Sequence, residues 1–246
     1  MFFSTTFTYD PEELIAYEIG YKGQFFNDTL QVFASTYLYD YENIHTFGSE
    51  VSQATGGTTS SVLEAPGAEI YGLEGEILWL ATDSITVGGN FSYTPSEYTK
   101  SLFIQDANDP RFPDGLIPNQ DTNLDIKGNR VLQVPEYKGS AFVTWDKPMG
   151  DRGDFSLTFS ASWISEVYFS QFETDLDRAP AYERYDLRGT WMSPNKNWIV
   201  TGFIHNLLDE VGIRQIEPHG STDGYRRTGQ VTEPQLYGLE VTWNLN

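Results

Sequence analysis

Nine segments of the sequence alternate side chains between two faces, and in eight of them one face carries no charge. In the segment 137–145, for example, the uncharged face is Tyr137, Gly139, Ala141, Val143 and Trp145. Alternation with a period of two predicts β-strands. An uncharged face repeated over so many strands favours contact with lipid over contact with a protein core. The eight clean segments are 17–25, 71–79, 85–93, 137–145, 155–163, 185–191, 198–204 and 237–245.

The ninth segment, residues 29–41, separates its two faces less cleanly. Leu30, Val32 and Leu38 share one face with Ala34 and Thr36. The other face mixes aromatic and polar side chains: Gln31, Phe33, Ser35, Tyr37, Tyr39 and Tyr41. We expect the aliphatic face to point the same way as the uncharged faces of the other strands.

The connections between these segments alternate between short and long. The short ones lie around Asn27-Asp28 and at 81–84, 146–154 and 193–197. The longer ones are 42–67, 96–133, 165–182 and 207–234. In an up-and-down sheet the short turns then meet at one end and the long loops at the other. Outer-membrane barrels show this asymmetry, with short periplasmic turns and long extracellular loops.

Aromatic residues mark both ends of the uncharged face. At the short-turn end they are Phe25, Trp79, Trp145, Phe155, Trp191, Trp198 and Trp243. At the long-loop end they are Tyr17, Tyr71, Tyr93, Tyr137, Trp163, Tyr185 and Tyr237. Two aromatic girdles around an apolar band are typical of the two interfaces of a membrane.

Composition limits the class of protein further. The chain has 15 Lys and Arg against 35 Asp and Glu, a net charge of −20, which excludes nucleic acid as a partner because phosphates require cationic contacts. It has no cysteine and no apolar run long enough for a transmembrane helix. A β-barrel is the other structure that satisfies every backbone group within a bilayer.

Five stretches resemble the barrel of TonB-dependent outer-membrane receptors. They include a "P-x-x-x-G-S" strand opening, an "NLxD" element and a final strand, and they fall at 11–23, 30–41, 134–140, 204–209 and 234–241. The resemblance implies an all-β, antiparallel, up-and-down transmembrane β-barrel of which residues 1–246 form the C-terminal portion. The family's barrel has about 22 strands. Nine strands therefore leave two unpaired edges, and we recognise neither the plug domain nor the energy-coupling segment of the family in this sequence.

The same resemblance implies a function and a set of partners. The expected function is TonB-energised uptake of a scarce nutrient, a ferric siderophore first of all, across the outer membrane of a Gram-negative cell, without enzymatic activity or a cofactor. The expected partners are outer-membrane lipid, the TonB complex acting through the plug, the nutrient ligand and the barrel-assembly machinery. The final strand resembles the signal read by that machinery, although Leu245 stands where an aromatic residue is usual.

Few residues are candidates for binding chemistry. Tyr225, Arg226 and Arg227 in the last long loop could contact an anionic ligand, but pairing with neighbouring acids is favoured. Arg184, Asp186 and Arg188 alternate on a polar face, which favours an ion-pair ladder in the barrel lumen over a substrate path.

Metal sites are also disfavoured. His45, His205 and His219 lack the spacing of metal ligands. The acidic loop with Asp106, Asp109, Asp114 and Asp121 has oxygen ligands suitable for calcium, but no defined loop spacing, so a solvated loop is favoured.

Two alternatives to the receptor remain open at this point. One is a self-contained porin-like or structural barrel that closes through oligomerisation. The other is a soluble acidic β-sandwich that binds carbohydrate through its loops and buries its aromatic face between two sheets.

Overall fold

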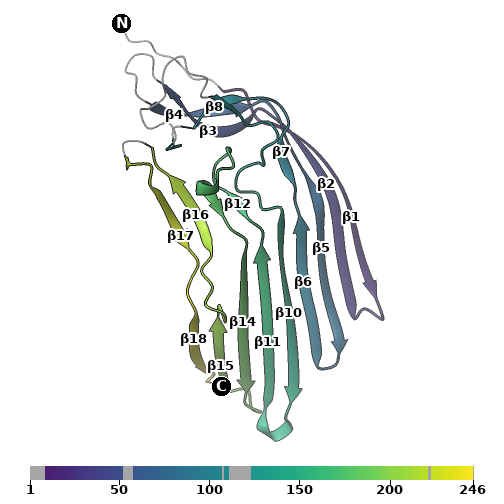
Figure 1. Cartoon of the computed structure of the whole chain (residues 1–246). Coiled ribbons are helices and arrows are strands. Elements are labelled where there is room, and N and C mark those ends of the chain that lie inside the picture. Colours follow the sequence, from purple (N-terminus) through teal and green to yellow (C-terminus); the bar gives the residue numbers. More distant parts are fainter. Residues whose placement is uncertain (1–8, 52–57, 107, 111–122, 221–222, 246) are drawn as a thin grey trace.

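The computed structural model describes residues 9–51, 58–106, 108–110, 123–220 and 223–245. Nine long antiparallel strands lie side by side in sequence order and confirm the predicted up-and-down sheet (Figure 1). These are β1 (Glu13–Phe25), β2 (Leu30–Glu42), β5 (Ala68–Thr82), β6 (Ile85–Tyr93), β10 (Tyr137–Pro148), β11 (Asp154–Ile164), β14 (Tyr182–Met192), β15 (Trp198–His205) and β18 (Leu236–Trp243).

The register of the strands places all nine uncharged faces on one side of the sheet, called here the apolar face. Ala141 of β10 lies opposite Gly89 of β6 and opposite Ala161 of β11. Leu38 lies opposite Tyr17, so the aliphatic side of β2 belongs to the same face as predicted. Directly opposite residues share a face because side chains alternate along each strand. A slip of one residue anywhere would turn a strand's apolar side chains to the other, polar face.

On each strand, charges reappear on the apolar face only beyond its aromatic rows: Lys147 follows Trp145 at the short-turn end, and the others lie at the long-loop end. Asp40 lies opposite Ile15 and Glu69, and Glu13 lies opposite Glu42. A transmembrane strand needs about 9–11 residues, whereas β1 and β2 each have 13. The strands are therefore longer than the apolar band, and their charged ends extend beyond it.

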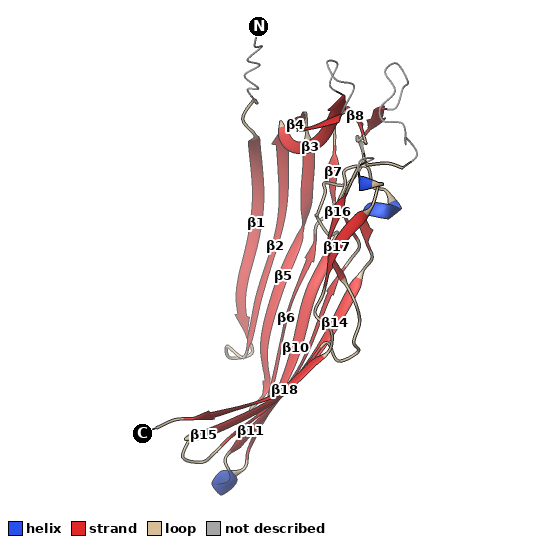
Figure 2. Cartoon of the chain, turned by 90° about the vertical axis from the view of Figure 1, so that its left-hand side faces the viewer, coloured by secondary structure: helices blue, strands red, loops and turns tan. Residues whose placement is uncertain are grey.

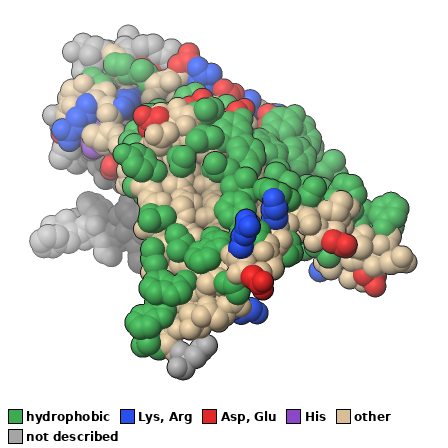
Figure 3. All heavy atoms as spheres, turned by 90° about the horizontal axis from the view of Figure 1, so that it is seen from below, with side chains coloured by type: hydrophobic (Ala, Val, Ile, Leu, Met, Phe, Trp, Pro, Cys, Tyr) green, Lys and Arg blue, Asp and Glu red, His purple; other side chains and the backbone are tan. Residues whose placement is uncertain are grey.

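The aromatic rows pair across neighbouring strands at both ends. Trp198 and Trp243 stack at the short-turn end, with ring centroids 5.7 Å apart. Tyr93 and Tyr137 stack at the long-loop end at 4.9 Å. Seen from the short-turn end, hydrophobic side chains gather in extended patches with few charges among them (Figure 3). The order of side chains along the strands thus reproduces the two rows expected from the sequence.

The sheet is open. Among the described residues β1 pairs only with β2, and β18 pairs only with β15 (Figure 2). The apolar face is not covered: Ile19 is 77% exposed and Leu239 is 71% exposed. A soluble β-sandwich requires this face to be buried against a second sheet, so the described part of the chain does not have that architecture.

The long connections contain further strands that the sequence analysis did not separate from loop. A four-stranded sheet has the order β4-β3-β8-β9, and two hairpins are formed by β12 with β13 and by β16 with β17. Strand β7 pairs with the upper end of β5. Their bounds are β3 (Ile44–Val51), β4 (Thr58–Ala65), β7 (Ser96–Tyr98), β8 (Phe103–Gln105), β9 (Asn123–Asp125), β12 (Val167–Tyr168), β13 (Arg178–Ala179), β16 (Ile213–Pro218) and β17 (Arg227–Val231).

These elements pack together into what is called here the loop assembly. Its small hydrophobic core contains Tyr98, Ile104 and Ile126, packed with Ala65 and Val131. Tyr98 and Ile126 are almost fully buried, which no side chain of the apolar face is. The loop assembly is therefore held by its own packing, and it lies at the long-loop end of the sheet (Figure 1).

The helices in the described ranges are the two short 3-10 turns η1 (Gly150–Arg152) and η2 (Asp175–Asp177). Neither they nor any other described segment forms a helix with the length and apolarity needed to cross a membrane.

Asn206 closes the end of β15 and gives the "NLxD" element a structural role. Its side-chain amide donates to the carbonyls of Glu210 and Glu233 at 2.8 and 3.0 Å and accepts from the Glu210 amide at 3.0 Å. Its backbone has φ of +52°, a conformation that Asn tolerates better than most residues. Asn206 thereby ties the start of the last long connection to its end.

We expect Asn206→Gly to lower the free energy of unfolding by about 1–3 kcal/mol, because the buried partners of the amide lose their hydrogen bonds. Glycine keeps the positive φ without strain, so the variant isolates the side chain. Asn43→Gly is the matched control: Asn43 also has positive φ (+55°), and its side chain makes no hydrogen bond with the described residues. Denaturant unfolding in phospholipid vesicles measures both. Equal losses in the two variants would contradict this role.

Candidate functional site

Arg227 lies in a buried ion pair at the centre of the loop assembly. Its Nε donates to Asp177 Oδ1 at 2.6 Å, and its Nη2 donates to the carbonyl of Asn108 at 3.0 Å. Its Nη1 donates to the carbonyl of Tyr225 at 3.0 Å. The Asp177 side chain is only 1% exposed and also accepts from Thr174. Arg227 thus joins the last loop to two other loops, which is the pairing with acids favoured from the sequence.

The two neighbouring candidates lie differently. Arg226 is 60% exposed in its side chain and lies 3.9 Å from Asp223. Tyr225 has positive φ (+54°) and supplies its carbonyl to Arg227. That any of these three residues contacts a ligand stays a prediction. Arg226 has the most exposed side chain of the three.

A second cluster is organised by Arg130. Its guanidinium lies 3.3 Å from Glu166 and 3.8 Å from both Glu136 and Glu173. The guanidinium also lies over the ring of Tyr168, 5.5 Å from its centroid. Arg130 therefore connects the loop before β10 with the loop between β11 and β14. Sequence analysis did not single it out, because an isolated Arg in a loop carries no pattern.

A cavity of about 410 Å³ opens beside the Arg227–Asp177 pair. Asp106 lines it and is 4% exposed. Its Oδ1 accepts a hydrogen bond from the Asn108 amide at 2.9 Å, while its Oδ2 has no partner among the described residues. The pKa of Asp106 is raised from 3.8 to about 6, chiefly by burial and also by the charges of Asp177 and Asp109, although the hydrogen bond from Asn108 and the charge of Arg227 lower it.

A carboxyl group whose pKa is raised in the folded state binds its proton more tightly there than in the unfolded state. Asp106 therefore favours folding below about pH 3.8, and this contribution is lost as the pH rises through about 6. We expect Asp106→Asn to increase the stability of the loop assembly at pH 7.5 by on the order of 1–2 kcal/mol and to change it little at pH 4. Hydrogen exchange of the β16–β17 amides at both pH values measures this. A destabilised variant at pH 7.5 would contradict it.

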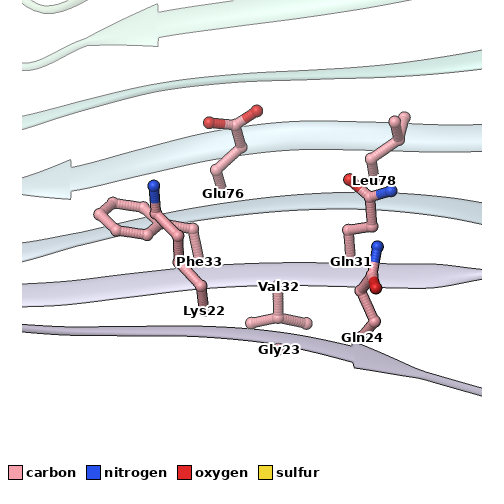
Figure 4. A pocket seen from close by; sticks show the side chains of 8 residues that line it. All are labelled: Lys22, Gly23, Gln24, Gln31, Val32, Phe33, Glu76 and Leu78. Atoms are coloured by element: carbon pink, nitrogen blue, oxygen red, sulfur yellow. The ribbon is translucent and has the colours of Figure 1, made fainter. Parts of the chain in front are cut away.

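A second hollow, of about 580 Å³, lies on the polar face of the sheet. Lys22 and Gln24 of β1 line it together with Gln31 of β2 and Glu76 of β5 (Figure 4). Phe33 projects into the same area, and the ammonium of Lys22 lies over its ring, 5.2 Å from the centroid. These side chains give the polar face mixed charge and hydrogen-bonding capacity.

The polar face also carries the predicted ion pair of β14. Arg184 Nε donates to Asp186 Oδ1 at 2.9 Å, and His205 Nδ1 of β15 lies 3.2 Å from Asp186 Oδ2. Arg188 forms no ion pair with the described residues. Of the ion-pair ladder expected from the sequence, the structure shows the Arg184–Asp186 pair, and His205 joins it in place of Arg188.

Metal ligands do not converge in the described ranges, where no group of three or more His, Asp or Glu side chains could hold an ion. His45, His205 and His219 belong to separate elements: His45 lies near Asp10, and His219 Nε2 lies 2.9 Å from Thr228 Oγ1. Of the acidic loop considered for calcium, Asp114 and Asp121 lie outside the described residues.

The fold and the sequence agree with one known family. The family model described as "TonB dependent receptor-like, beta-barrel" matches residues 1–207. The chain belongs to this family. TonB-dependent receptor barrels reside in the outer membrane of Gram-negative bacteria, and the family consists of receptors and transporters. A search of curated protein sequences found no match.

Solved structures of TonB-dependent receptors share the fold of the chain. The ferric yersiniabactin uptake receptor FyuA from Yersinia pestis matches with a TM-score of 0.71 and 18% identity over 96% of this chain. The siderophore receptor PiuA from Acinetobacter baumannii matches with a TM-score of 0.69 and 20% identity over 96% of this chain. The copper transporter OprC matches with a TM-score of 0.65 and 14% identity, also over 96% of this chain. The chain covers 30%, 29% and 32% of these structures, less than a third of each.

Proposed function

We propose that this chain is the C-terminal part of a receptor barrel in the outer membrane that takes up a ferric siderophore with energy from TonB. The observation that carries the proposal is the nine-strand sheet with one uncharged face and an ordered loop assembly at one end. Unpaired strand edges are not tolerated in lipid, so further strands of the receptor would pair with β1 and β18. A plug domain from outside residues 1–246 would lie against the polar face.

The ligand would first contact the loop assembly, and the plug would transmit the energy supplied by TonB. Of the structural relatives named above, one is a siderophore receptor, one is an uptake receptor for ferric yersiniabactin and one is a copper transporter, so a siderophore is favoured over other nutrients. We propose transport without chemical conversion of the ligand, since binding and release are the only steps that this architecture requires.

Uptake of radiolabelled iron by iron-limited cells tests the proposal. Cells that express the receptor are supplied with ferric hydroxamate, catecholate and citrate complexes in turn, and cells with the gene deleted provide the background. We expect the cells to take up one class of these ferric complexes, and we expect a proton uncoupler to abolish that uptake. Uptake that is insensitive to the uncoupler and does not discriminate between solutes would instead support the porin-like alternative.

A further inference from the structure

We infer that the short-turn end of the sheet binds the phosphate groups of anionic phospholipids, and that Lys147, Arg152 and Lys196 make the contacts. The inference adds a lipid preference to the receptor and rests on the proposed function, which places the apolar face in a membrane. It starts from the cations of two neighbouring short turns, one between β10 and β11 and the other between β14 and β15.

The described strands sort the charges on the apolar face by sign. At the short-turn end the charge that they place there is a cation, Lys147, which lies opposite Phe155. At the long-loop end the charges that they place on the same side are acidic: Glu13, Asp40, Glu42, Glu69 and Glu183. The whole chain has 35 Asp and Glu against 15 Lys and Arg, so a cation at the short-turn end runs against its composition.

The β10–β11 hairpin also separates its own charges between the two faces. Asp146 lies opposite Ser156, and Asp154 lies opposite Pro148. Side chains alternate along a strand, so both carboxylates point to the polar face while Lys147 points to the apolar face. The acids nearest to Lys147 in the sequence are therefore turned away from the lipid side.

Two further cations lie beside this hairpin end. Arg152 is the last residue of the turn η1, and Lys196 lies in the next short turn along the sheet. Both residues and Lys147 are exposed, and none of the three forms an ion pair within the described ranges. Asp151 is the acid that remains next to them, so positive charge is in excess here. Seen from this end, Lys and Arg side chains lie directly beside hydrophobic ones (Figure 3).

Aromatic contacts fix the depth of these cations. The ammonium of Lys147 lies over the ring of Trp145, 5.6 Å from its centroid. Trp191 Nε1 donates to the carbonyl of Arg152 at 2.8 Å, which holds the β10–β11 turn against the row of tryptophans. Interfacial Trp side chains lie at the level of the lipid headgroups. The cations beside them are therefore at the depth of the phosphates.

The chemistry of the headgroup decides which lipid is preferred. Ammonium and guanidinium groups both donate charge-assisted hydrogen bonds to phosphate oxygens. In phosphatidylcholine the trimethylammonium group cancels the phosphate charge, whereas phosphatidylglycerol has a phosphate without a counter-charge. A cation near a membrane surface favours anionic lipid by up to roughly fivefold at low salt. The patch therefore favours phosphatidylglycerol.

Quenching of tryptophan fluorescence by brominated lipids tests the inference. The receptor is folded into phosphatidylcholine vesicles that contain equal mole fractions of either brominated phosphatidylglycerol or brominated phosphatidylcholine. Five tryptophans of this chain mark the short-turn end of the apolar face and report the lipid there: Trp79, Trp145, Trp191, Trp198 and Trp243. The ratio of the two quenching efficiencies gives the relative affinity. We expect phosphatidylglycerol to be favoured about fivefold at low salt.

Two triple variants locate the preference. Lys147→Gln, Arg152→Gln, Lys196→Gln should reduce it to within about 1.5-fold. Lys127→Gln, Lys138→Gln, Arg188→Gln removes the same number of Lys and Arg charges from a loop and from the polar face, and it should keep the wild-type preference. Wild-type receptor at 1 M salt provides a second readout if the first variant folds poorly, because a Debye length of about 3 Å screens the attraction.

Three results would overturn the inference: equal quenching of the wild type by the two brominated lipids, the same preference in both triple variants, or a preference that persists unchanged at 1 M salt. Equal quenching is also the result expected if the cations serve an acidic soluble protein instead of lipid. Failure of the receptor function gives a different pattern. Iron uptake would then be absent or independent of energy, while phosphatidylglycerol would still be favoured through the three cations.

Discussion

Replacement of Arg227 by glutamine is expected to destabilise the loop assembly by about 3–5 kcal/mol, because it leaves a buried carboxylate without its counter-charge. Asp177 is the carboxylate concerned, and its side chain is 1% exposed. The same change disconnects the last loop from the carbonyl of Asn108. Opening should therefore appear in β16 and β17 rather than in the long strands of the sheet.

Hydrogen exchange of the β16–β17 amides measures this opening. Arg226→Gln is the matched control, since the same substitution at an exposed side chain should cost less than about 1 kcal/mol. The double variant Arg227→Gln, Asp177→Asn removes both charges and should recover much of the loss. Equal exchange in the Arg226 and Arg227 variants would show that the ion pair does not hold the loops together.

The second large effect concerns the apolar face. Ala141 lies midway between Tyr137 and Trp145 on this face, so Ala141→Arg places a charge near the middle of the apolar band. The expected cost is about 2–4 kcal/mol when the receptor is folded in phospholipid vesicles. Denaturant unfolding in the same vesicles measures it.

Asn90→Arg is the control for this experiment. Asn90 lies on the polar face at almost the same depth, opposite Ser140 and Glu76. Its arginine can pair with Glu76, and we expect a change within about 0.5 kcal/mol. A cost that is the same on both faces would mean that the apolar face is not in contact with lipid.

The main sheet could be predicted from the sequence because its information is local. Each strand carries its own alternation, and the aromatic residues at its ends fix where the apolar band stops. Even the orientation of β2, which has Phe33 and Tyr37 on its polar face, can be predicted once Leu38 is aligned with Tyr17 of the neighbouring strand. The two-residue alternation and the aromatic residues at the strand ends were sufficient to predict all nine strands.

The loop assembly could not be predicted in the same way. Asp177 and Arg227 are 50 residues apart in sequence, and no spacing rule links a carboxylate in one loop to a cation in another. Strand β8 has three residues, too few to show alternation. Tyr98 and Ile126 form a core that depends on how separate loops meet. Of the residues that hold this region, Asn206 had a sequence signal through the "NLxD" element, and Arg227 was expected to pair with acids, but nothing in the sequence identified Asp177 as its partner.

The absence of cysteine makes a direct test of lipid contact possible, because a single introduced cysteine labels one position. Spin labels placed one at a time along residues 137–145 of β10 report collision with oxygen, which is enriched in lipid, and with a water-soluble nickel chelate. We predict that accessibility alternates with a period of two. Odd-numbered positions should favour oxygen and even-numbered positions the chelate. High chelate accessibility at Ala141 and Val143, or no alternation, would contradict the placement of this face in the membrane.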